Sequence, residues 1–391
     1  MLELLWLLLP VAALSGWWIG QRSPQTGRNY ASPSRSFPDA YYQGLSYLLN
    51  EERDKALEAF TRMAEVDGET AEVHLALGSL FRNRGEVDRA IRIHQSLIAR
   101  PSLSRRERSQ ALLALGEDHL KAGVLDRAEN LFTELLADRE YATPALGHLL
   151  TIYEHEKEWS KAIEMARRLQ RQGDGRQYRD RIGQLRCELA AEARSRGDTG
   201  QARQLLRLAL EEDPGCVRAN ILRGDLEREL GRYKAALKAY EAVAEQDPGF
   251  LPEVLEGLEA SYQALGRPGQ METFLRQVIA RSPEGALIVR LVGLIERHRG
   301  PREALDELTL LLRRAPSLEG LRRLVDLTRT LEEPIGTREL QLFYELLDGL
   351  EAERPRYRCQ RCGFAGRILF WQCPGCKAWA TLRPIGEVET A

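Results

Sequence analysis

Cysteine is scarce in this sequence, which has only 6 among 391 residues. That is too few for a secreted domain whose fold depends on disulfides. Four of the 6 form two C-x-x-C pairs near the C-terminus, and this pairing indicates metal ligation in a reducing compartment. The other two, Cys187 and Cys216, lie within helical patterns. We expect them to be buried core residues and not reactive thiols.

Catalytic and nucleotide-binding motifs are also missing. The sequence has no G-x-x-x-x-G-K-[ST] phosphate loop, no G-x-G-x-x-G turn and no G-x-S-x-G nucleophile elbow. The string HEKEW at His155 begins like a zinc-protease motif, but it lacks the second histidine one helical turn later. No constellation of catalytic side chains can be nominated, so we predict that the protein is not an enzyme.

Acidic residues are absent from one stretch, Pro355 to Gly386, although the whole chain carries a net charge of -2. The same stretch holds six cations, namely Arg356, Arg358, Arg361, Arg367, Lys377 and Arg383. Four thiolates and one Zn(II) sum to about -2, so the stretch keeps a charge of about +4. Such a patch fits nucleic acid, anionic lipid or the acidic remainder of the chain, and it can also simply balance a thiolate site.

The first twenty residues, MLELLWLLLPVAALSGWWIG, are strongly apolar. The segment from Leu2 to Gly20, as a helix, spans roughly 28 Å and just crosses the hydrocarbon core of a bilayer. Its only charge is Glu3, whereas a cleaved signal peptide begins with cations. We therefore predict an uncleaved transmembrane anchor. The first charges after it are Arg22, Arg28 and Arg35, which place the rest of the chain in the cytoplasm.

The middle of the chain repeats with a period of 34 residues. In the first two units Gly44, Tyr47, Ala56 and Phe60 recur as Gly78, Phe81, Ala90 and His94. After an insertion of four residues the marker alanine returns at Ala128 and Ala162, and after a longer connection at Ala202, Ala236 and Ala304, with Gln270 in its place in one unit. These units resemble the tetratricopeptide repeat, in which a small residue lets two helices approach. The expected glycine is replaced at Leu150, Ala190, Leu258 and Val292. We expect about eight units, the later ones degenerate.

The C-terminal string RYRCQRCGFAGRILFWQCPGCKAW contains the paired cysteines, Cys359, Cys362, Cys373 and Cys376. Two such turns present four thiolates to one tetrahedral site, which suits Zn(II) best and a single iron less well. We expect GFAGRILFWQ to form a hairpin, with Phe364, Phe370, Trp371 and Trp379 as a small core that the metal completes. The pattern resembles rubredoxin and the zinc ribbons, although Lys377 stands where rubredoxin commonly has a second glycine. Two separate redox dithiols are the alternative.

The sequence thus predicts an all-α tetratricopeptide-repeat superhelix with an N-terminal transmembrane helix and a small C-terminal β zinc-ribbon or rubredoxin-like domain. The predicted boundaries are an anchor over 1–20, a flexible cytoplasmic tether over 21–38, the repeats over 39–353, the metal domain over 354–384 and a tail over 385–391. The concave face of such an array is usually a binding surface, which favours a scaffold over a catalyst.

This order of parts, with the strings MLELLWLLLPVAA and LGSLFRNRGEVDRAIRIHQSLIA and the cysteine string, resembles the lipopolysaccharide assembly protein B (LapB) family of Gram-negative bacteria. The resemblance implies a single-pass inner-membrane adaptor, with its bulk in the cytoplasm, that regulates lipopolysaccharide synthesis. It implies as partners the protease FtsH, its substrate LpxC, which is the deacetylase that commits lipid A synthesis, and a lipopolysaccharide-sensing inner-membrane protein. A homo-oligomer is compatible with it, and the metal ligands carry over to the four cysteines.

Three alternatives to an adaptor remain open at this point. A nucleic-acid-binding zinc ribbon predicts aromatic side chains such as Trp371 available for stacking, but the membrane anchor and the acidic body argue against it. A general membrane assembly scaffold fits the repeats equally well. A rubredoxin-type electron carrier predicts iron in the purified protein, which elemental analysis separates from zinc.

Overall fold

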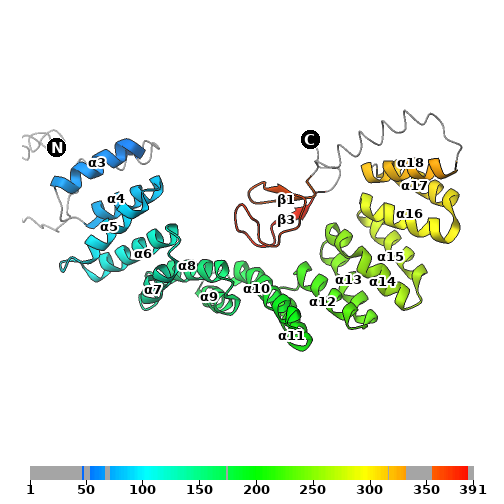
Figure 1. Cartoon of the computed structure of the whole chain (residues 1–391), viewed down its shortest axis with the longest axis horizontal. Coiled ribbons are helices and arrows are strands. Elements are labelled where there is room, and N and C mark those ends of the chain that lie inside the picture. Colours follow the sequence, from blue (N-terminus) through cyan, green and yellow to red (C-terminus); the bar gives the residue numbers. More distant parts are fainter. Residues whose placement is uncertain are drawn as a thin grey trace, which may run out of the picture. The chain divides into compact units, whose positions relative to one another are not determined.

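The computed structural model describes residues 46–47, 53–66, 71–172, 175–315, 317–331 and 355–385 (Figure 1). By their contacts the residues of the chain divide into two compact units, 1–103 and 104–391. The predicted anchor and tether lie outside the described residues. Among the helices that the structure describes, none is both long and apolar enough to cross a membrane.

The first unit contains helices α3 (Arg53–Val66), α4 (Ala71–Arg84) and α5 (Val87–Ile98). Helix α4 packs against both α3 and α5. The two marker alanines of this unit, Ala56 and Ala90, are fully buried between the helices. The repeat prediction is therefore correct for these positions.

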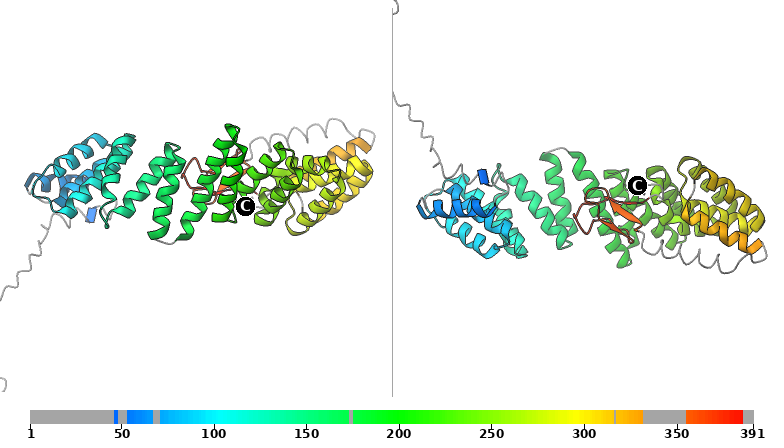
Figure 2. Two further views of the ribbon diagram at one scale, coloured as in Figure 1. Left: turned by 90° about the horizontal axis from the view of Figure 1, so that it is seen from below. Right: turned by 90° about the horizontal axis from the view of Figure 1, so that it is seen from above.

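In the second unit, each even-numbered helix from α6 to α16 packs against the odd-numbered helix that follows it. Figure 2 shows the helices in two further views. The helices are α6 (Arg105–Lys121), α7 (Leu125–Leu135), α8 (Ala142–His155), α9 (Trp159–Gln172), α10 (Gly175–Ser195), α11 (Thr199–Glu212), α12 (Val217–Glu229), α13 (Tyr233–Gln246), the 3₁₀ helix η2 (Pro248–Val254), α14 (Leu255–Ala264), α15 (Pro268–Arg281), α16 (Gly285–Arg299), α17 (Pro301–Arg314) and α18 (Leu318–Leu331). The predicted tetratricopeptide-repeat fold is confirmed.

The turn inside each helix pair uses a residue with left-handed backbone, which is usually glycine because a side chain disfavours that conformation. Gly123 has φ of 75° between α6 and α7, and Lys157 fills the same position between α8 and α9 with φ of 60°. The marker alanine follows five residues later, at Ala128 and Ala162. Both alanines are fully buried.

One predicted marker position is wrong. Gly266 follows the equivalent turn residue Gly231 by 35 residues, so Met271, and not Gln270, corresponds to Ala236. Met271 is buried, whereas Gln270 is exposed. The extra residue falls in the stretch that contains η2, whose tighter 3₁₀ winding shifts the register of the following helix.

Helix pairs approach closely where a glycine of the first helix faces a ring of the second. A Cβ atom on Gly224 would lie 2.2 Å from Tyr240 Cε1, and one on Gly116 would lie 2.6 Å from Phe132 Cε1. Where the sequence departs from glycine, the partner is smaller. Leu150 stands at the glycine position of α8, Ala166 stands at the ring position of α9, and both are fully buried. The exchange of large and small residues conserves the packed volume.

We predict that Gly224→Ala lowers the free energy of unfolding by about 2 kcal/mol, because the new methyl group overlaps the buried Tyr240 ring. Thermal unfolding followed by circular dichroism measures the change. Gly147→Ala in α8 is the matched control, since nothing lies within 4 Å of its Cβ position. The control should keep or slightly raise stability, because alanine favours helix. Equal melting temperatures for Gly224→Ala and the wild type would contradict this account of helix packing.

Candidate metal centre

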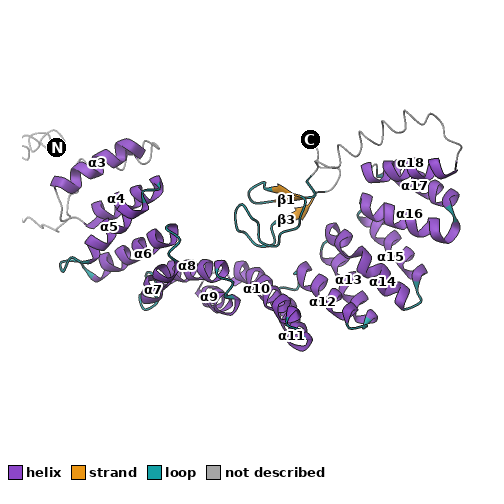
Figure 3. Cartoon of the chain, viewed as in Figure 1, coloured by secondary structure: helices purple, strands orange, loops and turns teal. Residues whose placement is uncertain are grey.

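The C-terminal ribbon, residues 355–385, is a small antiparallel sheet with the order β2-β1-β3 (Figure 3). Its strands are β1 (Tyr357–Cys359), β2 (Ala365–Gly366) and β3 (Leu382–Pro384). The hairpin predicted within GFAGRILFWQ is wrong. Only its Ala365–Gly366 part is a strand, and that strand pairs back with β1. The turn at Gly363, with φ of 76°, reverses the chain first.

The four cysteine sulfur atoms converge on one point. Sγ of Cys359 lies 3.7 Å from Sγ of Cys376, and Sγ of Cys362 lies 3.7 Å from Sγ of Cys373. All four sulfurs lie within 4.8 Å of one another. Metal–sulfur bonds of about 2.3 Å in a tetrahedron require sulfurs about 3.8 Å apart. The four predicted residues therefore form a metal-binding site.

The two knuckles have the same backbone form although their sequences differ. The N–H of Gly363 donates to the carbonyl of Cys359 at 2.9 Å, and the N–H of Lys377 donates to the carbonyl of Cys373 at 2.9 Å. Lys377 has φ of 57°, close to the left-handed conformation of Gly363. The lysine thus adopts the backbone of the missing glycine, and the departure from the rubredoxin pattern leaves the site geometry intact.

The thiols differ in how readily they ionise. Burial disfavours the Cys359 thiolate, but hydrogen bonding with the Thr381 side chain and with the backbone N–H of Cys362 outweighs burial and lowers the pKa of Cys359 to about 6. The N–H of Phe364 favours the Cys362 thiolate, yet burial and the neighbouring sulfurs raise the pKa of Cys362 to about 11. A divalent cation is what keeps all four groups ionised together.

Trp371 of the ribbon docks on the repeats. Its ring stacks on Phe250 of η2 with centroids 5.6 Å apart and planes 19° apart. The guanidinium of Arg218, from α12, lies over the same ring at 5.7 Å from the centroid. The indole is therefore held between an aromatic face and a cation, both favourable contacts for an aromatic ring.

Trp379 docks at a second point, the end of α8. Its Nε1–H donates to Oε1 of Glu154 at 3.1 Å, and its ring meets the edge of Trp159 with centroids 6.3 Å apart. Glu154 is buried, and Arg181 of α10 binds both its oxygens, at 2.5 and 2.7 Å. The buried carboxylate thus has a charged partner within the repeats, which makes its burial tolerable.

Two polar contacts complete the docking. Arg383 of β3 pairs with Asp247, and its guanidinium also lies 5.4 Å from the centre of the Phe250 ring. The Tyr357 hydroxyl donates to Glu253 of η2. Acidic residues of the repeats therefore pair with part of the basic stretch. The acidic remainder of the chain is one of the partners that the charge of this stretch predicts.

The predicted ribbon core is only partly correct. Phe364 packs inside the ribbon, but Phe370 is exposed and the two tryptophans face the repeats. The buried core of the ribbon consists of Tyr357, Cys359, Cys373 and Leu382. So small a sheet cannot cover two indole rings, and the helices bury them instead.

The acidic and aromatic residues of the repeats that contact the ribbon are not among those predicted from the sequence. They are Trp159, Glu154, Asp247, Phe250 and Glu253. The acid-free ribbon indicates that acidic partners exist, but nothing in a single sequence selects these from 58 acidic residues. One local signal is the HEKEW string, in which His155 is exposed as expected and Trp159 is buried against the ribbon.

Cys187 and Cys216 are buried, as predicted, with their sulfur atoms 3.9 Å apart. The hydrogen bond with Cys216 and burial raise the pKa of the Cys187 thiol. A raised pKa makes the Cys187 thiol unreactive at neutral pH, whereas the hydrogen bond with Cys187 lowers the pKa of Cys216. Both residues belong to the buried helix core and are separate from the metal site.

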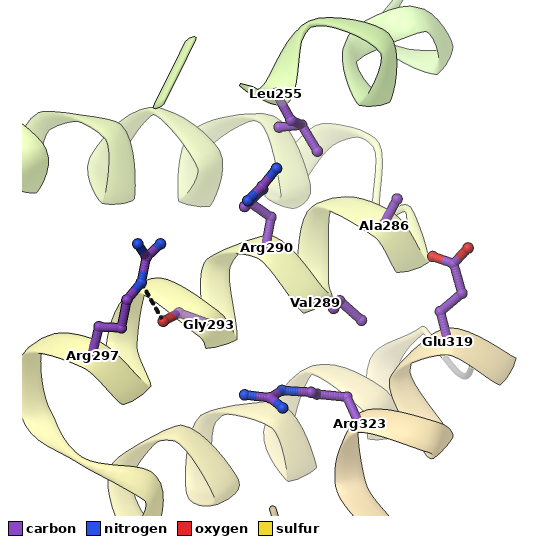
Figure 4. A pocket seen from close by; sticks show the side chains of 8 residues that line it. All are labelled: Leu255, Ala286, Val289, Arg290, Gly293, Arg297, Glu319 and Arg323. Atoms are coloured by element: carbon purple, nitrogen blue, oxygen red, sulfur yellow. Dashed lines mark hydrogen bonds between the residues drawn. The ribbon is translucent and has the colours of Figure 1, made fainter. Parts of the chain in front are cut away.

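A hollow of about 400 Å³ lies between α14, α16 and α18 (Figure 4). Its lining residues are Leu255, Ala286, Val289, Arg290, Gly293, Arg297, Glu319 and Arg323. Glu259 accepts hydrogen bonds from Arg290 at 2.9 Å and from Arg297 at 2.5 Å, and Arg323 pairs with Glu296. Each of the three arginines thus has a carboxylate partner within the repeats, and Arg290 and Arg297 share theirs.

We predict that Trp371→Ala releases the ribbon from the repeats without emptying the metal site, because the indole contacts η2 and α12 and binds no metal. Loss of its half-buried ring weakens docking by about 2 kcal/mol. Hydrogen exchange should become faster at η2, while elemental analysis should still find one metal per chain. Phe370→Ala, on the exposed side of the ribbon, is the control and should leave η2 unchanged. Unchanged exchange in Trp371→Ala would refute the docking.

Two protein families match parts of this chain. Residues 357–384 match the family described as rubredoxin metal binding domain, and residues 41–102, 113–176 and 187–249 match the tetratricopeptide repeat. A solved structure of the MamA protein is 19% identical over 47% of this chain and 94% of its own, with a TM-score of 0.33.

Two curated relatives cover the whole chain. Lipopolysaccharide assembly protein B of Escherichia coli K12 is 38% identical over 390 residues, which is 100% of both chains. The protein of the same name from Haemophilus influenzae is 33% identical over 398 residues, again 100% of both chains. Because the similarity extends over the full length at this identity, the chain belongs to the lipopolysaccharide assembly protein B family.

Proposed function

We propose that this protein is an inner-membrane adaptor that limits lipopolysaccharide synthesis by promoting proteolysis of LpxC by FtsH. The observation that carries the proposal is the full-length similarity to lipopolysaccharide assembly protein B. A lipopolysaccharide-sensing inner-membrane protein restrains the adaptor. The stacked repeats fit this function, since such arrays present extended surfaces to protein partners.

Residues 1–20 anchor the adaptor in the bilayer, and the remainder faces the cytoplasm. The apolar run from Leu2 to Gly20 and the arginines that follow it support this location. Confinement to the plane in which a membrane protease works raises the effective concentration of the adaptor and its bound substrate near that protease. The adaptor thereby accelerates turnover without chemistry of its own.

The ribbon acts as a clasp on the repeats. It contacts α8, α12 and η2 through Trp379, Trp371 and Arg383. Through these contacts the ribbon links α8 to η2, which is distant from α8 in the sequence. The ribbon thereby orients the part of the array that binds LpxC. The hollow between α14, α16 and α18 is free of these contacts and is the part that we assign to the substrate.

We assign Zn(II) to the four-cysteine site, since the sulfur spacing fits a closed tetrahedral S4 site of the structural kind. Elemental analysis of protein purified without added metal should find about one zinc per chain. Cys373→Ser should lose that zinc, and Cys216→Ser, which lies outside the site, should keep it. Red protein with one iron per chain would replace this assignment with a rubredoxin-type centre.

We predict that Cys359→Ser slows LpxC turnover several-fold in cells while the protein stays in the membrane fraction. Loss of one thiolate abolishes metal-coupled folding of the ribbon, so the clasp is lost. The measurement is the half-life of LpxC after synthesis is blocked, with Cys187→Ser as a control that should support normal turnover. Normal LpxC turnover in Cys359→Ser would remove the ribbon from the mechanism. Normal turnover in a strain without this protein would remove the proposed function itself.

A further inference from the structure

The docked ribbon keeps a strongly basic exposed surface. Of its six cations, Arg383 pairs with Asp247, and the other five are exposed. None of these five forms an ion pair with any residue that the structure describes; they are Arg356, Arg358, Arg361, Arg367 and Lys377. With the metal site counted at about -2, the exposed surface carries about +3. Charge balance of the thiolates therefore accounts for only part of the cations.

The exposed surface of the ribbon also carries apolar side chains. Ile368 is 67% exposed and Phe370 is 38% exposed, and both follow Arg367 on the segment between the two knuckles. The residues that alternate with them, Leu369 and Trp371, pack against the repeat core, so Ile368 and Phe370 stay exposed while the segment is docked. Large apolar side chains together with several cations are typical of a surface that binds the membrane–water interface. The cations contact the phosphates of lipid headgroups, and the apolar side chains insert between the headgroups and the acyl chains.

The structure argues against nucleic acid as the partner of this surface. Single-stranded nucleic acid is bound with aromatic faces for base stacking, and Phe370 is the one aromatic side chain of the described ribbon that is exposed. Trp371 is stacked between Phe250 and Arg218, and Trp379 is engaged by Glu154, so the docked ribbon presents neither indole. Arg290 and Arg323, which line the hollow between α14, α16 and α18, each form an ion pair within the repeats. The five exposed cations of the ribbon form none with the described residues, so they are the better partners for phosphate groups.

We infer that this exposed surface of the ribbon binds the anionic phospholipid surface of the membrane, with Arg361, Arg367 and Lys377 on headgroup phosphates and Ile368 in the interface. The inference rests on the membrane attachment within the proposed function. It adds a second, peripheral contact to the predicted anchor, and it makes that contact dependent on lipid charge.

Hydrogen exchange of the full chain tests this contact. The protein is purified in nanodiscs that contain phosphatidylglycerol and phosphatidylcholine, or phosphatidylcholine alone. Amides of residues 361–370 should exchange about threefold to tenfold more slowly with phosphatidylglycerol, and high salt should reverse most of the effect. Equal exchange in the two bilayers overturns the inference. Protection that arises only when LpxC is added, irrespective of lipid, also overturns it and makes an acidic protein the partner.

Paired variants separate the contact from folding. Arg367→Glu combined with Ile368→Asp should abolish the lipid-dependent protection while keeping one metal per chain and unchanged exchange at η2. Lys234→Glu combined with Lys238→Glu, which reverses the same kind of charge on exposed positions of α13, should retain the protection. Loss of protection in both pairs would show general charge attraction and overturn the assignment to the ribbon.

Failure of the inference and failure of the proposed function give different results. Retention of the chain in the nanodisc fraction reports the anchor, whereas protection of residues 361–370 reports the ribbon contact. A chain that stays in the bilayer and supports LpxC turnover, with an unprotected ribbon, refutes only the lipid contact. A chain that does not insert, but whose ribbon is still protected by added phosphatidylglycerol vesicles, supports the lipid contact and refutes the anchor.

Discussion

The close approach of paired helices is the constraint on which the rest of this structure depends. Gly116 and Gly224 leave no room for a side chain because the rings of Phe132 and Tyr240 already fill the space. Each pair offers its outer faces to the next pair, so the array propagates only if every approach is maintained. The helices that receive the ribbon, α8, α12 and η2, inherit their positions from this packing, and the docking geometry is therefore a consequence of it.

The ribbon is too small for the burial of its own apolar side chains to stabilise its fold. Its own core is four side chains, two of which are metal ligands. It compensates in two ways, with a metal that fixes four thiolates and with two tryptophans that use the repeats as the missing half of a core. The cysteines thus hold the ribbon together, and the tryptophans attach it to the repeats.

Sequence reasoning succeeds where a residue type has few physical alternatives. Spacing places the four cysteines at one metal site, and small residues at a fixed period locate the buried contacts of the helices. It fails at Gln270, because a 3₁₀ turn changes the register without changing the hydrophobic pattern. It also fails at Trp371 and Trp379. An indole ring can be buried in the core of its own domain or against the surface of another domain, and the sequence is the same in both cases. Only the three-dimensional structure shows that these two rings pack on the repeats.

The buried carboxylate of Glu154 has a consequence for how the clasp behaves. Arg181 holds both its oxygens from within the repeats, so departure of Trp379 would leave a neutralised ion pair and not a stranded charge. The Trp379 contact therefore adds a hydrogen bond to a carboxylate whose charge is already balanced within the repeats. Charge pairing and ribbon attachment are thus separate contributions at Glu154.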